Sequence, residues 1–248
     1  MYAQKGIAYY GHIESPGMRS AAGPDLNAYL VFDKKHSYYV TAKDSLEQDA
    51  FVNNKSIYTN NNSKQVAYNG NKTFRYGKQV YYNKSKDSIW WSSRFRGNIY
   101  IAEKKPNIKW ILKNETKKIG DFTTYKAIAK FRGRIYTAWY TTEIPIPYGP
   151  WKLQGLPGLI LEAYDEKKEM FFYFKSIEYP TENEIGIYQV KRPKDDPDGW
   201  QTIHDYEKML RESLARAYNR MILRAEKKGK EKPLKPIFRD IYIESFDD

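Results

Sequence analysis

Short runs of alternating hydrophobic and polar residues, separated by glycines and charged turn residues, occupy most of the chain before residue 180. Such alternation predicts strands that bury one face, and the regular spacing of the turns is typical of an antiparallel sheet. The expected strands cover residues 5–14, 26–32, 37–42, 73–83, 87–95, 98–104, 108–113, 122–131, 134–142, 158–164 and 169–178. The pattern therefore predicts a mainly β protein (β-rich α+β) with a curved antiparallel sheet or partial barrel.

The hydrophobic period changes near residue 202. Hydrophobic side chains then recur every three or four positions from Ile203 to Ala225, which predicts a C-terminal amphipathic helix docked on the sheet. Thr202, with Asp205 three residues later, is expected to cap its start, and Gly229 is expected to follow its end. Residues 237–246 contain a short apolar run that predicts one last edge strand.

A basic stripe runs beside the apolar stripe of this helix. Arg216, Arg220 and Arg224 are spaced four residues apart, so they share one helical face. The stripe is either a solvated surface or a contact for an anionic membrane surface or an acidic partner.

The domain organisation follows from these patterns. Residues 1–190 are expected to form an antiparallel β domain, 191–201 a polar linker, and 202–248 a basic helix and tail packed on the same domain. Three aspartates in the linker lack the remaining ligands of a calcium loop, so the sequence predicts no metal site there.

Aromatic doublets recur along the predicted strands. Neighbouring strand residues point to opposite faces, so each doublet is expected to place one ring on each side of the sheet. Either both faces are covered, or one face presents rings to a ligand. The doublets are Tyr9-Tyr10, Tyr38-Tyr39, Tyr81-Tyr82, Trp90-Trp91 and Phe171-Phe172. The candidate ligand-binding or partner-binding residues are Trp90, Trp91, Trp139, Trp151, Arg216, Arg220 and Arg224.

The most unusual stretch is a proline-rich connection over residues 143–157, followed by an apolar run. Pro157 and Gly158 predict a type II turn in which Gly158 takes a positive φ. Leu159 to Leu161 then predict a buried strand. These side chains offer no acid, base or nucleophile, so the stretch is expected to be structural.

Charge and composition narrow the function. The net charge of +12 favours acidic partners, and the absence of cysteine excludes disulfides, thiolate catalysis and cysteine-based zinc sites. No run approaches the roughly 18 apolar residues of a membrane span. Only three histidines are present, and no recognised catalytic or phosphate-binding motif occurs. Glu143, Glu162 or Asp165 could supply a carboxylate pair, but nothing selects them. The sequence therefore predicts no catalytic residue, cofactor or metal.

The central stretch resembles the GLPGLI proteins of the Bacteroidota. Gly155-Leu156-Pro157-Gly158-Leu159-Ile160 matches all six letters of that motif, and the resemblance covers roughly residues 5–178. The flanking matches include Gly133-Arg134, Ala138-Trp139-Tyr140-Thr141, Ile144-Pro145-Ile146 and Gly149-Pro150. The resemblance implies export into the periplasm or envelope, and residues 1–4 fit a chain whose signal peptide has been removed. It implies no catalytic residues.

Genes of that family often accompany outer-membrane TonB-dependent transporters. We therefore expect a non-enzymatic, periplasmic or outer-membrane-associated binding or accessory protein, with such a transporter or another outer-membrane complex as partner. The first alternative is a carrier of a lipid, acyl chain or peptide in a concave sheet. A hydrolase of unrecognised type is the second, and export makes nucleic acid an unfavoured partner.

Overall fold

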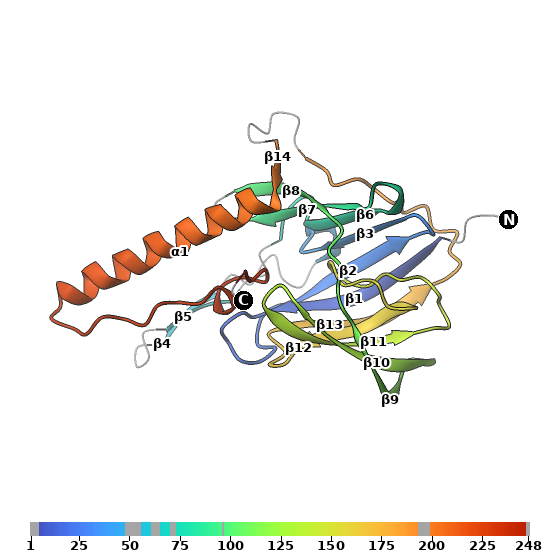
Figure 1. Cartoon of the computed structure of the whole chain (residues 1–248), viewed down its shortest axis with the longest axis horizontal. Helices are drawn as coiled ribbons and strands as arrows, with labels where there is room; N and C mark the ends of the chain where they lie inside the picture. Colours follow the sequence, from blue (N-terminus) through green and yellow to red (C-terminus); the bar gives the residue numbers. More distant parts are fainter. Residues whose placement is uncertain are drawn as a thin grey trace.

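One open sheet of twelve strands organises the computed structural model, which describes residues 5–47, 56–60, 65–69, 73–95, 97–192 and 199–246 (Figure 1). The sheet is not closed into a barrel, and the predicted mainly β class is confirmed. All pairs are antiparallel except the one between β14 and β8. In spatial order the strands are β14 (Trp200–Thr202), β8 (Asn98–Lys104), β7 (Ser88–Arg94), β6 (Lys78–Asn83), β3 (His36–Thr41), β2 (Asp25–Phe32), β1 (Gly6–Glu14), β13 (Met170–Glu178), β12 (Leu159–Asp165), β11 (Arg134–Thr141), β10 (Phe122–Phe131) and β9 (Ile111–Ile119).

Each of the eleven predicted strands has a counterpart in the sheet, one of them displaced, whereas the sequence pattern predicted neither β14 nor the separate two-stranded hairpin. The strand predicted at residues 108–113 is β9, which runs from Ile111 to Ile119 and forms an edge of the sheet. Most residues of β9 are exposed, so the strand has no buried face and its sequence does not alternate between hydrophobic and polar residues. A separate hairpin joins β4 (Ser56–Asn60) and β5 (Gln65–Asn69).

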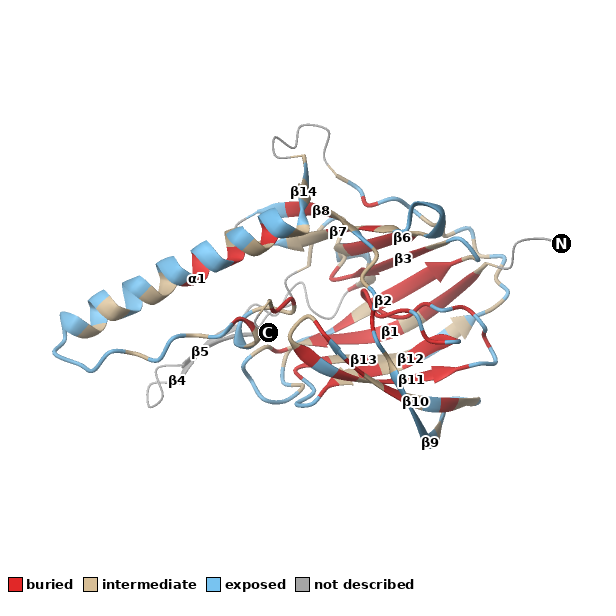
Figure 2. Cartoon of the chain, in the orientation of Figure 1, coloured by how far each residue is buried: buried red, intermediate tan, exposed pale blue. Residues whose placement is uncertain are grey.

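Four of the five aromatic doublets divide between two hydrophobic clusters, one on each face of the sheet, as predicted. Tyr10, Tyr39, Tyr82 and Trp91 lie in one hydrophobic cluster, on what we call the first face. Their chain neighbours Tyr9, Tyr38, Tyr81 and Trp90 belong to a second cluster on the second face. Figure 2 shows continuous burial along the central strands.

Both faces are covered by segments without regular structure. The proline-rich connection packs on the first face through apolar residues between 144 and 156, namely Ile144, Ile146, Tyr148, Trp151, Leu153 and Leu156. On the second face, Ile185, Ile187 and Val190 of the chain after β13 contact the smaller cluster. The covering segments explain why a single sheet can be apolar on both sides.

The turn before β12 differs from its prediction. Gly155 has a φ of +97°, whereas Gly158 is not in the left-handed region. Gly158 is required for another reason: a Cβ placed there would lie 2.0 Å from the carbonyl oxygen of Thr141. Leu156, Leu159 and Ile160 are almost fully buried, so the hexapeptide anchors β12 in the core.

The helix α1 spans Ile203–Glu226 and begins at the predicted cap. The Thr202 hydroxyl accepts from the Asp205 amide, and the Asp205 carboxylate accepts from the Thr202 amide, which completes a capping box. The predicted docking is confirmed only for the first half. Tyr206, Leu210 and Leu214 are buried, and the rest of the helix projects beyond the sheet (Figure 2).

The chain turns back after Gly229 and runs alongside α1 (Figure 1). The Tyr218 hydroxyl donates to the Pro233 carbonyl, which holds the returning chain against the helix. The edge strand predicted within residues 237–246 is wrong. This C-terminal segment forms a short 3₁₀ turn at Phe238–Asp240, and its side chains and carbonyls are held by buried cations rather than by a strand partner.

None of the described helical residues forms a stretch long and apolar enough to cross a membrane.

Candidate functional site

A cavity of about 180 Å³ opens between the first face of the sheet and the C-terminal segment. Strands β1, β3, β6 and β7 supply its floor, and residues 241–244 supply the opposite wall. We call it the ionic pocket, because several charged side chains line it together with aromatic ones. Its lining includes His12, Glu14, Tyr39, Lys78, Trp91, Ser92, Trp151, Tyr206, Tyr242 and Glu244.

A row of three titratable side chains crosses the floor of the ionic pocket. His12 Nε2 lies 2.9 Å from one Glu14 oxygen, and Lys78 Nζ lies 2.5 Å from the other. His12 and Glu14 are two residues apart on β1, so they point to the same face. Lys78 starts β6, two strands beyond β2 in the sheet. The contact between Lys78 and Glu14 therefore depends on the sheet order β1-β2-β3-β6, which brings the start of β6 to the same side as the end of β1.

The charge state of the row follows from its surroundings. Burial alone raises the pKa of the Glu14 carboxyl, but the Lys78 ammonium and the His12 ring outweigh this and hold that pKa well below its ordinary value. On the other side, the Tyr39 hydroxyl lies 2.8 Å from His12 Nδ1, and burial raises the pKa of that phenol far above its usual range. Glu14 is thus a fixed anion, and Tyr39 remains protonated at neutral pH.

A second charged cluster, almost shielded from solvent, adjoins the pocket and shares Glu244 with its lining. Lys152 contacts Glu103 at 3.2 Å and also pairs with Glu244. Arg132 pairs with the same two carboxylates, so two cations meet two anions. Burial lowers the pKa of Lys152, and the two carboxylates oppose that effect. The Lys152 ammonium also lies 3.1 Å from the centre of the Trp91 ring, whose indole nitrogen donates to Glu103.

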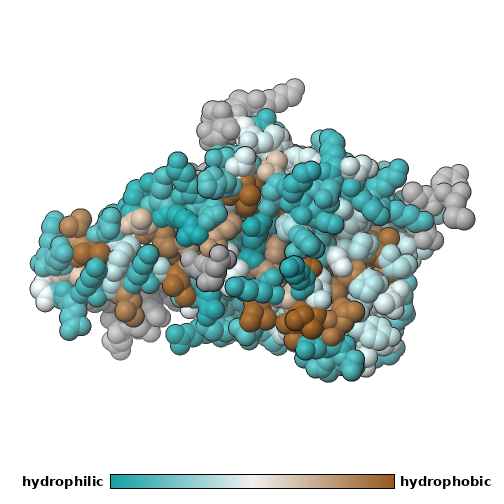
Figure 3. All heavy atoms as spheres, viewed as in Figure 1, coloured by the Kyte–Doolittle hydropathy of each residue, from teal (hydrophilic) through white to brown (hydrophobic). Residues whose placement is uncertain are grey.

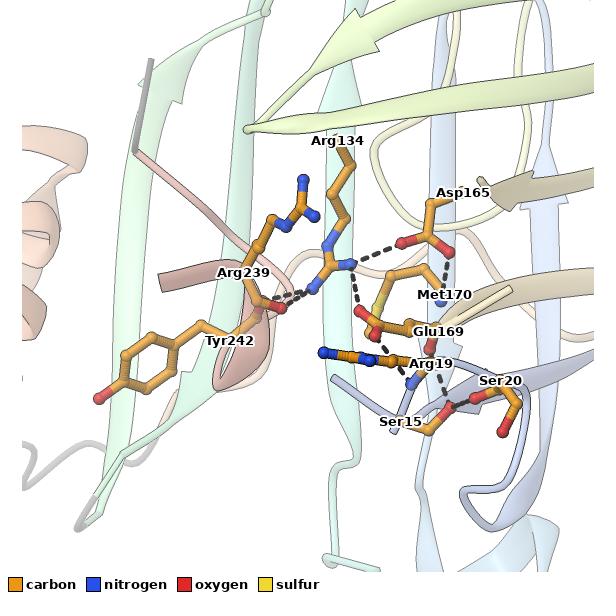
Figure 4. A network of polar contacts seen from close by, with 9 residues as sticks. All are labelled: Ser15, Arg19, Ser20, Arg134, Asp165, Glu169, Met170, Arg239 and Tyr242. Atoms are coloured by element: carbon orange, nitrogen blue, oxygen red, sulfur yellow. Dashed lines mark hydrogen bonds and ion pairs between the residues drawn. The ribbon is translucent and has the colours of Figure 1, made fainter. Parts of the chain in front are cut away.

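A third cluster holds the C-terminal segment from the β11 side (Figure 4). The Arg134 guanidinium lies 2.5 Å from Asp165 and 3.0 Å from Glu169. These two carboxylates stand on either side of the turn that joins β12 to β13. The second terminal nitrogen of the guanidinium, Nη2, donates to the main-chain carbonyls of Arg239 and Tyr242. The wall of the ionic pocket is therefore fixed by two buried cationic anchors, Arg134 and Lys152.

The four tryptophans predicted to bind a ligand or partner do not lie together in the structure. Trp91 and Trp151 both line the ionic pocket. Trp90 lies on the second face, with its ring centre 5.7 Å from that of Tyr81. Trp139 is buried on β11, and Lys117 stacks over it at 4.5 Å. Only two of the four thus share a cavity.

The predicted arginine stripe lies elsewhere. Arg216, Arg220 and Arg224 are exposed on the projecting half of α1. Arg216 pairs with Glu212 one turn earlier at 3.3 Å. None of the three lines the ionic pocket, so the stripe and the rings belong to different surfaces.

Sequence reasoning missed most of the ionic residues. No local motif predicts a site role for His12, Lys78, Lys152 or Arg134, although Lys152 lies in the proline-rich connection and Arg134 in a flanking match to the GLPGLI family. The available signal was a histidine and a glutamate two apart on an otherwise apolar strand, which placed both on a buried face. The partners of that pair depend on sheet order and could not be found locally.

The remaining titratable candidates have structural contacts. His36 lies 3.2 Å from Asp33, and His204 is exposed at the start of α1. Glu143 accepts from the Thr123 amide, and Glu162 pairs with Lys117 at 2.6 Å. Within the described residues, no group of three or more His, Asp or Glu side chains could hold a metal ion. The aspartate run at 195–198 lies outside the described residues.

Comparison with known proteins bears on the segment around β11 and β12. Residues 132–162 match the family model Porph_ging, described as a protein of unknown function. This is a Bacteroidota-type domain. The Porph_ging match includes Arg132, Arg134, Lys152 and the whole Gly155–Ile160 hexapeptide. No curated protein matches the chain.

Two solved structures share the fold. They are structures of PNGF-II in the P21 and C2 space groups, with a TM-score of 0.51 in each case. The sequence identities are 12% and 13%, and the similarity covers 84% and 86% of this chain. The chain spans about a third of the length of those proteins, at 33% and 34%. At this identity the likeness concerns the fold alone.

Proposed function

We propose that this chain is a non-enzymatic binding protein of the bacterial envelope that takes a small polar ligand in the ionic pocket. The observation that carries this proposal is the His12–Glu14–Lys78 row on the floor of a cavity of about 180 Å³. Lys78 and Glu14 remain partly accessible, at 33% and 18% of their side-chain surface. The pocket thus offers both a donor and an acceptor to a ligand.

The size and walls of the pocket define the ligand class. Pockets that bury a drug-sized ligand measure roughly 300–1,000 Å³, so this cavity suits a smaller molecule. Charged groups on the floor favour a ligand with hydrogen-bonding groups of its own, while Trp91, Trp151 and Tyr206 supply apolar contact. These features do not favour the acyl-chain carrier, because the proline-rich connection already fills the first face.

The electrostatics support binding rather than catalysis. A general acid or base works best when its pKa lies near the operating pH. The carboxyl groups of Glu14, Glu103 and Glu169 instead have lowered pKa values, because neighbouring cations outweigh the effect of burial. Each is paired with a lysine or arginine, and Glu14, which lines the ionic pocket, therefore presents a fixed negative charge to a ligand.

The envelope assignment is part of the same proposal. The Porph_ging match contains the complete Gly155–Ile160 hexapeptide, which supports membership of the GLPGLI family and a periplasmic or outer-membrane-associated location. The proposed partner is a TonB-dependent transporter or another outer-membrane complex. Capture of a stoichiometric transporter from native outer membranes by the tagged chain is the expected result. Recovery with cytoplasmic proteins alone contradicts this part.

Ligand binding is tested separately on the purified chain. Monosaccharides, amino acids and dicarboxylates are titrated one at a time, with heat of binding as the readout. The Lys78→Met variant is expected to weaken any binding by at least about tenfold, through loss of a charge-assisted hydrogen bond of roughly 1.5–3 kcal/mol. The matched control is Lys105→Met, since Lys105 is 35% exposed and also pairs with one carboxylate, Asp87.

Two outcomes contradict the proposal that the ionic pocket binds a small polar ligand. Binding that is weakened equally by Lys105→Met locates the ligand elsewhere, and absence of binding for all three compound classes rejects the proposed ligand chemistry. Turnover of any compound, abolished by Glu14→Gln, replaces the binding role with an enzymatic one.

A further inference from the structure

The projecting half of α1 and the chain that returns beside it form a basic arm, which we define as residues 215–237. It carries eight basic against two acidic residues, and therefore +6 of the net charge of +12. All eight basic side chains are exposed: Arg216, Arg220, Arg224, Lys227, Lys228, Lys230, Lys232 and Lys235. Half of the excess charge is thus concentrated on less than a tenth of the chain.

The cations of the arm are not used to hold the fold. Among the described residues, Arg216 is the only one of the eight in an ion pair, and Glu212 is its exposed partner. Lys232 lies over the Tyr218 ring at 6.0 Å, which orders the returning chain without neutralising it. The field of the arm therefore faces solvent.

Exposed aliphatic side chains are interspersed with these cations. Leu234 is 93% exposed and Leu223 is 56% exposed, and Met221 and Ile237 are also exposed. Figure 3 shows the projecting end of the molecule as hydrophilic surface interrupted by hydrophobic side chains. The arm therefore offers clustered positive charge and several exposed aliphatic side chains on the same projecting part of the molecule.

We propose that the basic arm docks on an anionic phospholipid surface. Lysines and arginines near such a surface each gain roughly 1 kcal/mol from the headgroup charge, and neighbouring aliphatic groups bury themselves at the boundary between headgroups and acyl chains. Leucine and methionine suit this role, whereas single-stranded nucleic acid is usually held by aromatic rings that stack on bases. The combination of clustered cations with exposed aliphatic tips therefore favours a bilayer.

The geometry gives this docking a consequence for the ionic pocket. Tyr206 lines the pocket near the start of α1, and Arg224 lies 18 residues further on. At about 1.5 Å per helical residue, the helix separates them by roughly 27 Å. An arm bound through its tip thus holds the pocket away from the lipid, open to solvent.

The test measures sedimentation of the full chain with vesicles of mixed phosphatidylglycerol and phosphatidylcholine, and with vesicles of phosphatidylcholine alone. The chain is expected to bind the anionic vesicles only, and to be released by salt. The arm variant combines Arg220→Gln, Arg224→Gln and Lys228→Gln. The matched control combines Lys34→Gln, Lys35→Gln and Lys109→Gln, three exposed lysines of the sheet body, with the same loss of charge.

The arm variant is expected to bind about 100-fold more weakly, and the control within about threefold of the parent chain. A second variant, Leu223→Ser with Leu234→Ser, is expected to weaken binding by about tenfold or more while keeping the charge. All three sets of changes lie at exposed positions, so circular dichroism and melting temperature should be unchanged.

Three results of the vesicle experiments overturn the proposal. They are an absence of binding to anionic vesicles, an equal loss for the arm variant and its control, and no effect of the two serine substitutions. A duplex oligonucleotide or polyglutamate that binds the arm more tightly than the vesicles do also overturns it, and identifies nucleic acid or an acidic protein as the partner.

Discussion

The ammonium of Lys152 and the carboxylate of Glu244 form an ion pair that is almost fully shielded from solvent, although 92 residues separate them in the chain. Lys152 belongs to the proline-rich connection, and Glu244 belongs to the C-terminal segment. The pair therefore joins the two coverings of the first face. Since Glu244 also lines the ionic pocket, the stability of the core and the shape of the pocket depend on the same contact.

Removal of this lysine is expected to be costly. Lys152→Met leaves the buried carboxylates of Glu103 and Glu244 with Arg132 as their one remaining cationic partner among the described residues. Breaking a buried pair in this way costs about 3–5 kcal/mol of unfolding free energy. Denaturant unfolding measures it. Lys105→Met, which breaks an exposed pair with Asp87, serves as the control and is expected to cost at most about 1 kcal/mol. Equal effects of the two variants contradict the buried-pair account.

The second prediction concerns Gly158. A Cβ on this residue lies 2.0 Å from the Thr141 carbonyl oxygen, a main-chain atom that cannot rotate away. Gly158→Ala is therefore expected to lower the unfolding free energy by about 3 kcal/mol or more, at the upper end of overpacking effects. Gly97→Ala is the control, because its Cβ meets nothing within 4 Å.

A further variant separates steric contact from backbone strain at Gly158. Asparagine tolerates positive φ better than alanine does. If the residue is glycine because of a close approach, Gly158→Asn destabilises at least as much as Gly158→Ala. If thermal melting shows that Gly158→Asn destabilises the protein less than Gly158→Ala does, the close-approach explanation is wrong and Gly158 has a positive φ.

Local patterns predicted most of the fold because the local rules and the tertiary structure agree. Strand and turn patterns located β1 to β3 and β6 to β13 but not β4, β5 or β14, and the Thr202–Asp205 capping box located the start of α1. The apolar run at 237–246 predicts a strand, and this prediction is wrong. The backbone of this segment is instead bound by Arg134, and its carboxylate by Lys152, neither of which is close in sequence.

The ionic pocket shows the same limit more strongly. The doublets correctly placed Trp90 and Trp91 on opposite faces of the sheet, but nothing local indicated that Lys78 meets Glu14, 64 residues away. That contact depends on the order β1-β2-β3-β6 in the sheet. A search for catalytic motifs passes over such a row, since only His12 and Glu14 are close in sequence and Lys78 lies 64 residues beyond Glu14.

The third prediction concerns acid stability. The pKa of Glu14 is lowered from 4.5, because Lys78 and His12 outweigh the opposing effect of burial. A lowered folded-state pKa contributes stability that is complete above the unfolded value and is lost as the pH falls toward the folded value. Glu14→Gln is therefore expected to be less stable than the parent by about 2 kcal/mol at neutral pH.

The gap between the two proteins should narrow as the pH falls below about 4.5. Both still lose stability in acid, because the lowered pKa values of Glu103 and Glu169 act in the same direction. Urea unfolding across the acidic range measures the difference. A gap that stays constant with pH shows that the Glu14 charge does not stabilise the fold.

The last prediction tests how much of α1 belongs to the core. Leu210 is completely buried against the first-face cluster, whereas Met221 is 43% exposed on the projecting half. Leu210→Ala is expected to cost about 2–5 kcal/mol of unfolding free energy through lost burial and the cavity left behind. Met221→Ala is expected to change it by less than about 0.5 kcal/mol. Denaturant titration of both variants gives the comparison. A large effect at Met221 means that the distal helix packs on the body in solution, in which case the basic arm cannot project from it.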